Sequence, residues 1–264
     1  MRPIYARLIK NTLASSVGAT VSAFRSPPKR FIIFTNGRTG SNWLVSLLRS
    51  HPEIRVHSEI FGEHQISDTD IRKLISRVGP VQYLESCFRR MLTENYVGLK
   101  MLYYQIEEDF GIGRGVTGLS TLSKAIFEDP DLYFIHLKRL NHVDRLLSNA
   151  RAKASGQFLN GAYSDEKIII DIDWAHAELG RMVQWESKFD ELLPADRTFN
   201  TSYEEMIEDA SSVATSVFEF LNCKQVAAVS QLKKQKGSSL KGSIGNYDAF
   251  KDSLKNTQFF DMTD

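Results

Sequence analysis

The chain has few cysteines, no acidic residue near its beginning and no long apolar run. Two cysteines in 264 residues, Cys87 and Cys223, exclude a framework of several disulfides and a multi-cysteine metal site. They are typical of small buried side chains in a reducing compartment. No Asp or Glu precedes Glu53, whereas eight Lys and Arg residues do. We therefore expect residues 1–29 to form a basic N-terminal arm.

The most apolar part of that arm, residues 13–24, is too short and too rich in Ser, Gly and Thr to span a bilayer. A poor signal peptide and a helix on a membrane surface both stay open for it. The net charge of +1 argues against a protein built to hold long nucleic acids. Any anion that the chain binds must therefore meet local cations.

Apolar runs that alternate with amphipathic stretches predict the order of elements, and the length predicts a single domain over residues 30–264. Strands are expected at 31–35, 54–57, 96–103, 132–137 and 197–201. Helices are expected at 40–49, 67–78, 81–93, 119–128, 143–155, 174–193 and 203–221. This alternation predicts an α/β fold with a mostly parallel central sheet flanked by helices. In such folds, ligands bind outside the carboxyl ends of the strands.

A short polar turn, NGRTGS, joins the first strand to the first helix at residues 36–41. A helix N-terminus is an anion site, because its first N–H groups are unpaired. We expect Gly37 and Gly40 to permit backbone angles and close approach that a Cβ would block. Thr39 and Ser41 add hydroxyls, and Arg38 adds a full charge. Phosphate or sulfate suits this set, although a plain turn with N-cap hydroxyls stays open.

The turn is not a Walker A loop, which needs four residues between its glycines and then Lys-Ser/Thr. Instead, TNGRTGSNW resembles the loop that wraps the 5′-phosphosulfate in sulfotransferases that use 3′-phosphoadenosine 5′-phosphosulfate (PAPS). Arg38 falls where many relatives carry Lys, and Trp43 where a Trp stacks on adenine. Among these enzymes, the chain looks most like the bacterial carbohydrate sulfotransferases of the trehalose-2-sulfotransferase and Nod-factor type.

Three further segments carry the same resemblance, in the order of the family. Arg139 and Ser148, in FIHLKRLNHVDRLLSNARAKASGQF, match the 3′-phosphate segment. Tyr203, in TSYEEM, matches a Tyr that lies near the adenine. SLKGSIGNYDAF resembles a C-terminal loop that closes over the 3′-phosphate, although its Leu240 replaces an Arg of the cytosolic enzymes.

The resemblance implies a sulfotransferase fold related to that of P-loop NTPases, and a sulfotransferase that takes PAPS as co-substrate without a metal. The PAPS-binding residues that it implies are Arg38, Thr39, Gly40, Ser41, Asn42, Trp43, Arg139, Ser148, Tyr203, Lys241 and Gly242. The six histidines show no ligand spacing such as His-x-x-x-His, which agrees with the absence of a metal.

Sulfuryl transfer to a hydroxyl needs charge stabilisation on the leaving phosphate and a general base. Arg38 and the amides beside it are the candidates for the first task. The segment IRVHSEIF offers two candidates for the base, His57 and Glu59. Glu59 is favoured, because the bacterial relatives place a Glu at this point. Lys100, which also matches a bacterial lysine, would orient the sulfonate or the acceptor, or else keep its head in water.

The resemblance implies a hydroxyl-bearing acceptor, which we expect to be a glycan or glycolipid. Its pocket is expected around residues 61–79 and 103–118, with 107–118 as a mobile lid and with His176 or Arg181 touching the sugar. Two other functions stay open: a degenerate module that binds nucleotide or glycan, and a nucleotide-dependent kinase. We expect a cytoplasmic location, where PAPS is made, and leave membrane association through the arm and a homodimer open.

Overall fold

The computed structural model describes residues 26–91, 93–156, 166–230, 232 and 240–263, so residues 1–25 of the predicted arm lie outside the described residues. Its centre is a sheet of five strands in the order β2-β3-β1-β4-β5. All four strand pairs are parallel, which confirms the predicted α/β fold. The strands are β1 (Lys29–Thr35), β2 (Ile54–His57), β3 (Tyr96–Leu102), β4 (Leu132–Lys138) and β5 (Thr198–Ser202).

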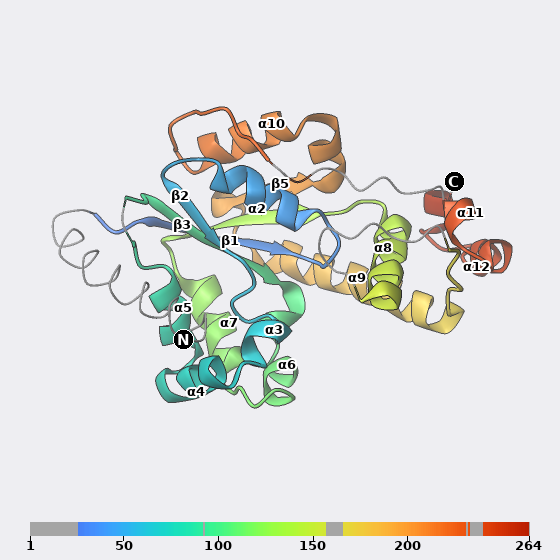
Figure 1. The fold of residues 1–264 in the computed structure, drawn as a ribbon, viewed down its shortest axis with the longest axis horizontal. Helices are drawn as coiled ribbons and strands as arrows, with labels where there is room; N and C mark the ends of the chain where they lie inside the picture. Colours follow the sequence, from blue (N-terminus) through green and yellow to red (C-terminus); the bar gives the residue numbers. More distant parts are fainter. Residues whose placement is uncertain (1–25, 92, 157–165, 231, 233–239, 264) are drawn as a thin grey trace.

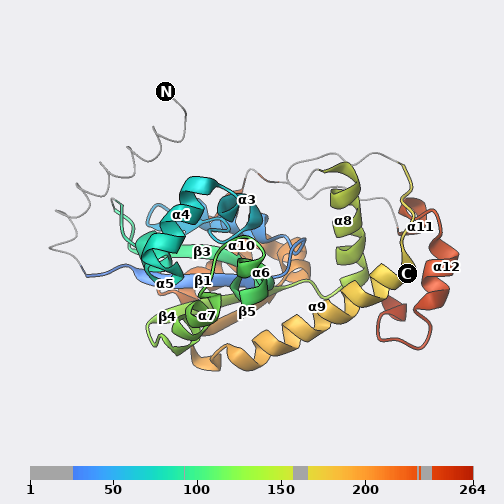
Figure 2. The same cartoon turned by 90° about the horizontal axis from the view of Figure 1, so that it is seen from below.

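Helices cover both faces of the sheet and continue beyond its carboxyl edge (Figure 1). One face carries α2 (Ser41–Arg49) and α10 (Tyr203–Phe220). The other carries α3 (Glu63–Ile66), α4 (Thr69–Val78), α5 (Pro80–Cys87), η1 (Tyr103–Ile106), α6 (Glu108–Ile112) and α7 (Leu119–Glu128). Beyond the carboxyl edge lie α8 (His142–Ser155), α11 (Leu240–Ser243), α12 (Tyr247–Ser253) and η3 (Phe260–Thr263). The long helix α9 (Ile172–Leu192) runs from the sheet to this group, and η2 (Ala195–Arg197) leads into β5 (Figure 2).

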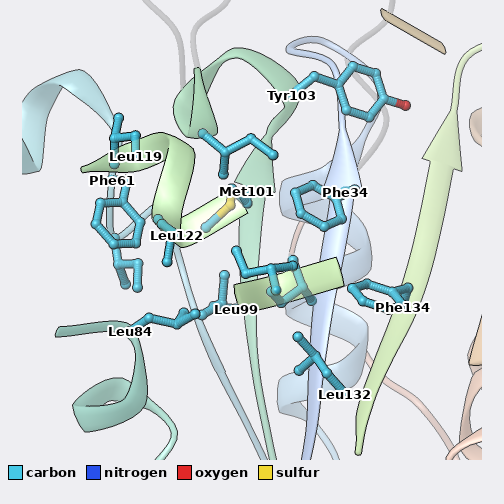
Figure 3. Packing of buried hydrophobic residues seen from close by; sticks show 14 of the residues in the cluster. Phe34, Phe61, Leu84, Leu99, Met101, Tyr103, Leu119, Leu122, Leu132 and Phe134 are labelled. Atoms are coloured by element: carbon cyan, nitrogen blue, oxygen red, sulfur yellow. The ribbon is translucent and has the colours of Figure 1, made fainter. Parts of the chain in front are cut away.

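Strand β1 is buried on both faces, as its continuous apolar run predicts. Phe31 and Ile33 pack towards α2 and α10, whereas Ile32 and Phe34 enter the core on the opposite face (Figure 3). This alternation is the two-residue period of a strand. Gly98 of β3 makes room for β1, because a Cβ there would lie 2.3 Å from the ring of Phe31.

Several helices differ by one or more residues from their predicted bounds. The helix predicted at 67–78 begins later, at Thr69, because the side chain of Asp68 caps it by accepting from the Asp70 and Ile71 amides. The helix predicted at 81–93 is α5, which ends at Cys87. In the described part of the chain, no helix combines the length and apolarity needed to cross a membrane.

Candidate functional site

The turn between β1 and α2 places two residues in the left-handed region. They are Arg38, at φ 68°, and Gly40, at φ 77°. Gly40 also needs to be glycine for space, because a Cβ there would lie 2.6 Å from Cδ2 of Tyr203. Gly37 has no positive φ, and a Cβ on it would meet nothing within 4 Å. The expectation of an unusual backbone angle is therefore wrong for Gly37, since Arg38 carries that angle instead, whereas close approach of a ligand at Gly37 stays a prediction.

The hydroxyl of Thr39 is buried and has partners inside the turn. It lies 2.6 Å from the Thr35 hydroxyl and donates to the Asn36 carbonyl at 3.0 Å. Thr35 in turn donates to the Leu137 carbonyl of β4 at 2.7 Å. These bonds fix the turn on the sheet and give the Thr39 hydroxyl partners inside the protein.

Helix α2 begins as an anion-binding helix should. Its N-cap residue, Gly40, supplies no side-chain cap, and its first turn contains no acidic residue. The first turn contains Ser41, which is buried, and the half-buried Asn42 and Trp43. Because no side chain occupies the helix end, the partial positive charge of the helix faces whatever lies over the turn.

Arg38 and Arg139 meet although they lie 101 residues apart in sequence. Nη1 of Arg139 donates to the Arg38 carbonyl at 3.4 Å, and its guanidinium lies 4.5 Å from the ring centre of Tyr203. Nε of Arg38 donates to the hydroxyl of Ser148 on α8 at 3.0 Å. Asp144 pairs with Arg139 at 3.1 Å. The structure thus brings together residues of three of the four motifs.

Arg145 also holds the turn, and sequence reasoning missed it. Its Nε donates to the Gly37 carbonyl at 2.7 Å, and its Nη2 lies 3.6 Å from Oε1 of Glu178 on α9. Burial lowers the pKa of Arg145 to about 10, so the group stays charged at neutral pH. Arg145 lies between Arg139 and Ser148 in the quoted segment, but only its fold-dependent contact with Gly37 reveals its role.

Three buried donors beside the turn have no acceptor among the described residues. They are Nδ2 of Asn36, on a residue that is 2% exposed, Nε of Arg139 and Nη1 of Arg145. Buried donors are rarely left unpaired in folded proteins, because each unmet group costs desolvation energy. Together with the uncapped helix, they suit an anionic ligand.

Glu59, the favoured base, lies in a network of four side chains. Its Oε1 lies 2.6 Å from Nζ of Lys100, and its Oε2 accepts from Nε2 of Gln105 at 2.7 Å. Lys100 also donates to Oδ1 of Asn42 at 2.9 Å. Lys100 is only 4% exposed, so the alternative that its head lies in water is wrong. A single lysine therefore connects the first turn of α2 to the candidate base.

The remaining predicted residues lie on three elements, β2, α2 and α11. His57 is half-buried at the end of β2, opposite Leu99 in the sheet. Trp43 packs against the core under α2 and α10. Lys241 and Gly242 are exposed on α11, which α8 holds through a 2.6 Å bond from Arg151 to Ser243. The structure thus brings the C-terminal motif to the helix that carries Ser148.

Aromatic side chains from three elements gather next to Glu59. The ring of Tyr104 lies 5.0 Å from that of Phe110 and 5.7 Å from that of Trp185, centre to centre. Tyr104 precedes Gln105, which contacts Glu59; burial raises the pKa of Tyr104, and the charge of Glu59 adds to the effect. Arg181 lies 5.4 Å from the Trp185 ring. His176 does not join this group; it lies 3.3 Å from the Ser253 hydroxyl of α12.

The segment predicted as a mobile lid, 107–118, is held at both ends. It contains the short helix α6, and the Glu108 carboxylate accepts from the amides of Gly118 and Ser120 at 2.8 and 2.7 Å. These bonds lower the pKa of Glu108. Val116, which belongs to the segment, is buried in the core. A closing motion of this loop would have to break these contacts.

A family model described as the sulfotransferase domain matches residues 28–260, so the chain belongs to the sulfotransferase family. The match covers all four motifs. It confirms the family that the motifs indicate, and with it the class of enzymes that transfer sulfuryl groups. The bacterial carbohydrate subtype stays a prediction. Comparison with curated protein sequences finds no significant match.

Solved structures of sulfotransferases are similar to this chain at low sequence identity. A sulfotransferase from Alicyclobacillus acidocaldarius is 14% identical, with a TM-score of 0.51, over 87% of this chain and 94% of that one. Sulfotransferase STF9 from Mycobacterium avium is 14% identical, with a TM-score of 0.47, over 90% and 79%. Mouse SULT7A1, solved with PAP, is 12% identical, with a TM-score of 0.42, over 79% and 64%. The first similarity confirms the predicted sulfotransferase fold.

Proposed function

We propose that the protein transfers the sulfuryl group of PAPS to a hydroxyl, and that the acceptor is a carbohydrate or a glycolipid. One observation carries the proposal: Lys100 joins Asn42, at the start of the helix after the anion-binding turn, to the carboxylate of Glu59. A donor held on the turn would thus lie close to a base. Membership of the sulfotransferase family supports the reaction class.

The residues of the site fit an adenosine nucleotide with phosphates at both ends. The uncapped start of α2, the left-handed Arg38 and Gly40, and the unmatched donor of Asn36 offer positive charge and N–H groups to a 5′-phosphosulfate. Arg139, with its own unmatched Nε, and Ser148 extend the site towards α8. PAPS supplies the activated sulfuryl group.

Within this site, Glu59 would take the proton of the acceptor hydroxyl as its oxygen bonds to sulfur. The bond from sulfur to the phosphate oxygen breaks, and its electron pair stays on the phosphate, where Arg38 stabilises the charge. Lys100 lies where it would keep Glu59 from repelling the sulfonate. The products are a sulfate ester and 3′-phosphoadenosine 5′-phosphate (PAP).

The aromatic group beside Glu59 supports the finer proposal of a carbohydrate acceptor. Tyr104, Phe110 and Trp185 give flat, half-buried surfaces to which the apolar face of a sugar ring can pack. Of the two residues considered for contact with the sugar, Arg181 lies in this group and His176 does not.

Radiolabelled PAPS and a panel of sugars, glycolipids and simple alcohols test the proposal directly. We expect transfer of label to a sugar hydroxyl in the wild type and almost none in Glu59→Gln. Transfer only to simple alcohols or phenols would reject the carbohydrate acceptor. PAP binding without transfer to any acceptor would favour the degenerate binding module. Transfer of phosphate from ATP would favour a kinase, against which stand the missing Walker lysine and the Lys138-Arg139 pair after β4.

A further inference from the structure

Gln105 is a fully buried polar residue in the first turn after β3, and no motif includes it. Its Oε1 accepts from the backbone N–H of Leu102 at 3.0 Å, and its Nε2 donates to Oε2 of Glu59 at 2.7 Å. Both polar ends of the side chain thus have a partner. One partner is the backbone at the end of a central strand, and the other is the candidate base.

The chemistry of these partners fixes the orientation of the amide. A backbone N–H can only donate, so the oxygen of Gln105 must face Leu102 and its NH₂ group must face Glu59. Oε2 of Glu59 then acts as an acceptor, while Oε1 faces the ammonium of Lys100. Both carboxylate oxygens therefore accept, as those of an ionised carboxylate do. Rotation of the carboxylate would break one bond or the other.

Gly62 limits the same side chain from the opposite direction. A Cβ on Gly62 would lie 2.9 Å from the Cβ of Glu59 and 3.1 Å from its Oε2. The Gly62 N–H also closes a turn on the Glu59 carbonyl at 3.2 Å. The space that a side chain at position 62 would occupy is thus filled by the Glu59 carboxylate, which Gln105 holds.

We propose that Gln105 is a positioning residue for the base: its amide, anchored to the end of β3, aims the Glu59 carboxylate at the acceptor hydroxyl, and Gly62 leaves the space for it. The inference rests on the proposed function, because it takes Glu59 as the proton acceptor. Misplacing a reacting group by about 1 Å costs on the order of 100-fold in rate. Gln105 would therefore act on turnover and not on donor binding.

Gln105→Glu separates this role from a structural one. Glutamate has the same shape and keeps an oxygen for the Leu102 N–H, but it places a second carboxylate against Glu59. If Gln105 only anchored the backbone, this variant would keep its activity. We expect instead a loss of about 10- to 100-fold in kcat, with the KM for PAPS within about twofold of wild type. Gln105→Leu and Gly62→Ala should lower kcat in the same way.

Slow hydrolysis of PAPS, in which water replaces the acceptor, supplies a rate that needs no knowledge of the acceptor. Asn95→Asp is the matched control, because Asn95 likewise donates to a carboxylate, Glu53, at the opposite end of the same strand. We expect this control to keep its kcat. Thermal unfolding and PAP binding are measured for every variant, so that unfolded protein is not scored.

The outcomes separate the two proposals. A normal kcat in Gln105→Glu, in protein that binds PAP, would overturn the role of Gln105 and leave the proposed function standing. A raised KM for PAPS with an unchanged kcat would also overturn it, since Gln105 would then serve donor binding. A wild type that neither binds PAP nor hydrolyses PAPS would instead overturn the proposed function itself.

Discussion

The two ends of the same parallel sheet use their charged residues differently. At the amino end, Arg197 donates to the Leu132 carbonyl at 2.8 Å, and Arg30 pairs with Glu85 and Asp129 at 3.2 and 3.0 Å. The guanidinium groups of these two arginines are thus paired with other groups of the protein. Arg139 and Asn36 at the carboxyl end and Arg55 and Arg90 near the amino end all keep buried donors without an acceptor among the described residues, but only the first two lie beside the uncapped start of α2.

The difference indicates which end of the sheet is suited to bind a ligand. Parallel strands bring their carboxyl ends and the starts of the following helices to one edge, so unpaired N–H groups gather there. The uncapped α2 adds to this excess. The amino end has similar residues, including an amide on a carboxylate at Asn95 and Glu53, and serves as an internal control.

The largest difference between the two ends should follow from one substitution made at both. Glu59→Gln removes the candidate base and should lower kcat by about 10² to 10⁴-fold, the usual contribution of general base catalysis. Glu53→Gln at the amino end should leave kcat unchanged. Steady-state rates with PAPS and an acceptor from the panel measure both. Equal losses of kcat in the two variants would mean that catalysis does not depend on the carboxyl end more than on the amino end.

Gly40→Ala should have the next largest effect. The new Cβ would meet Tyr203 at 2.6 Å in a backbone conformation at φ 77°. Strain and overpacking together should lower the free energy of unfolding by roughly 4 kcal/mol and weaken PAP binding. Chemical denaturation and calorimetry measure the two effects. A variant as stable as wild type would show that Tyr203 does not press on this turn.

A buried histidine near the carboxyl end predicts a pH effect on stability. His136 is 1% exposed and lies 2.6 Å from the Tyr103 hydroxyl; burial, and then the charge of Lys138, lower its pKa to about 4 from 6.5. Asp190 and Glu186 also face it and oppose this shift. Below pH 6.5 the histidine binds a proton in the unfolded chain, whereas in the folded protein it does so only when the pH falls to about 4. Stability therefore falls as the pH falls through this window.

The histidine should account for about 3 kcal/mol of the loss in unfolding free energy between pH 6.5 and pH 4. His136→Gln should remove this part of the slope, measured by denaturant unfolding at several pH values. If wild type and variant show parallel pH curves, His136 takes up its proton in the folded protein as easily as in the unfolded chain.

Gly37→Ala should have the smallest effect and is the control for Gly40→Ala. Gly37 has no positive φ and has open space where the Cβ would lie. We expect the free energy of unfolding to change by less than about 1 kcal/mol and PAP affinity to stay near that of wild type. A large loss of PAP affinity would show that the ligand itself occupies this space.

The local parts of the site could be predicted from sequence because their chemistry lies in adjacent residues. The turn after β1 combines an apolar strand, Arg38, Gly40 and hydroxyls within a few positions, and this pattern predicts both the bend and the anion site. Even there, the pattern did not show that the Thr39 hydroxyl is buried between Thr35 and the Asn36 carbonyl. Glu59 was predicted because it follows a strand at a point where the resemblance to bacterial relatives implies a Glu.

The partners of these residues could not be predicted, because they depend on strand order. Lys100 reaches Glu59 only because β2 lies beside β3, and the alternation of strands and helices does not reveal that order. Gln105 lies 46 residues from Glu59 in sequence, and Arg145 lies 108 from Gly37. Nothing in the residues beside either one indicates these contacts. The roles of such residues can be recognised only in the fold, which brings distant segments together.

The central claim is that the carboxyl end of the sheet holds an adenosine nucleotide on Arg38 and the start of α2. Calorimetric titration with PAP, of the wild type and of Arg38→Ala and Asn95→Asp, tests it most directly. We predict one PAP per chain in the wild type and Asn95→Asp, and at least a tenfold weaker affinity in Arg38→Ala, about 1.4 kcal/mol. Absence of PAP binding in the wild type, or equal affinity in Arg38→Ala, would contradict it.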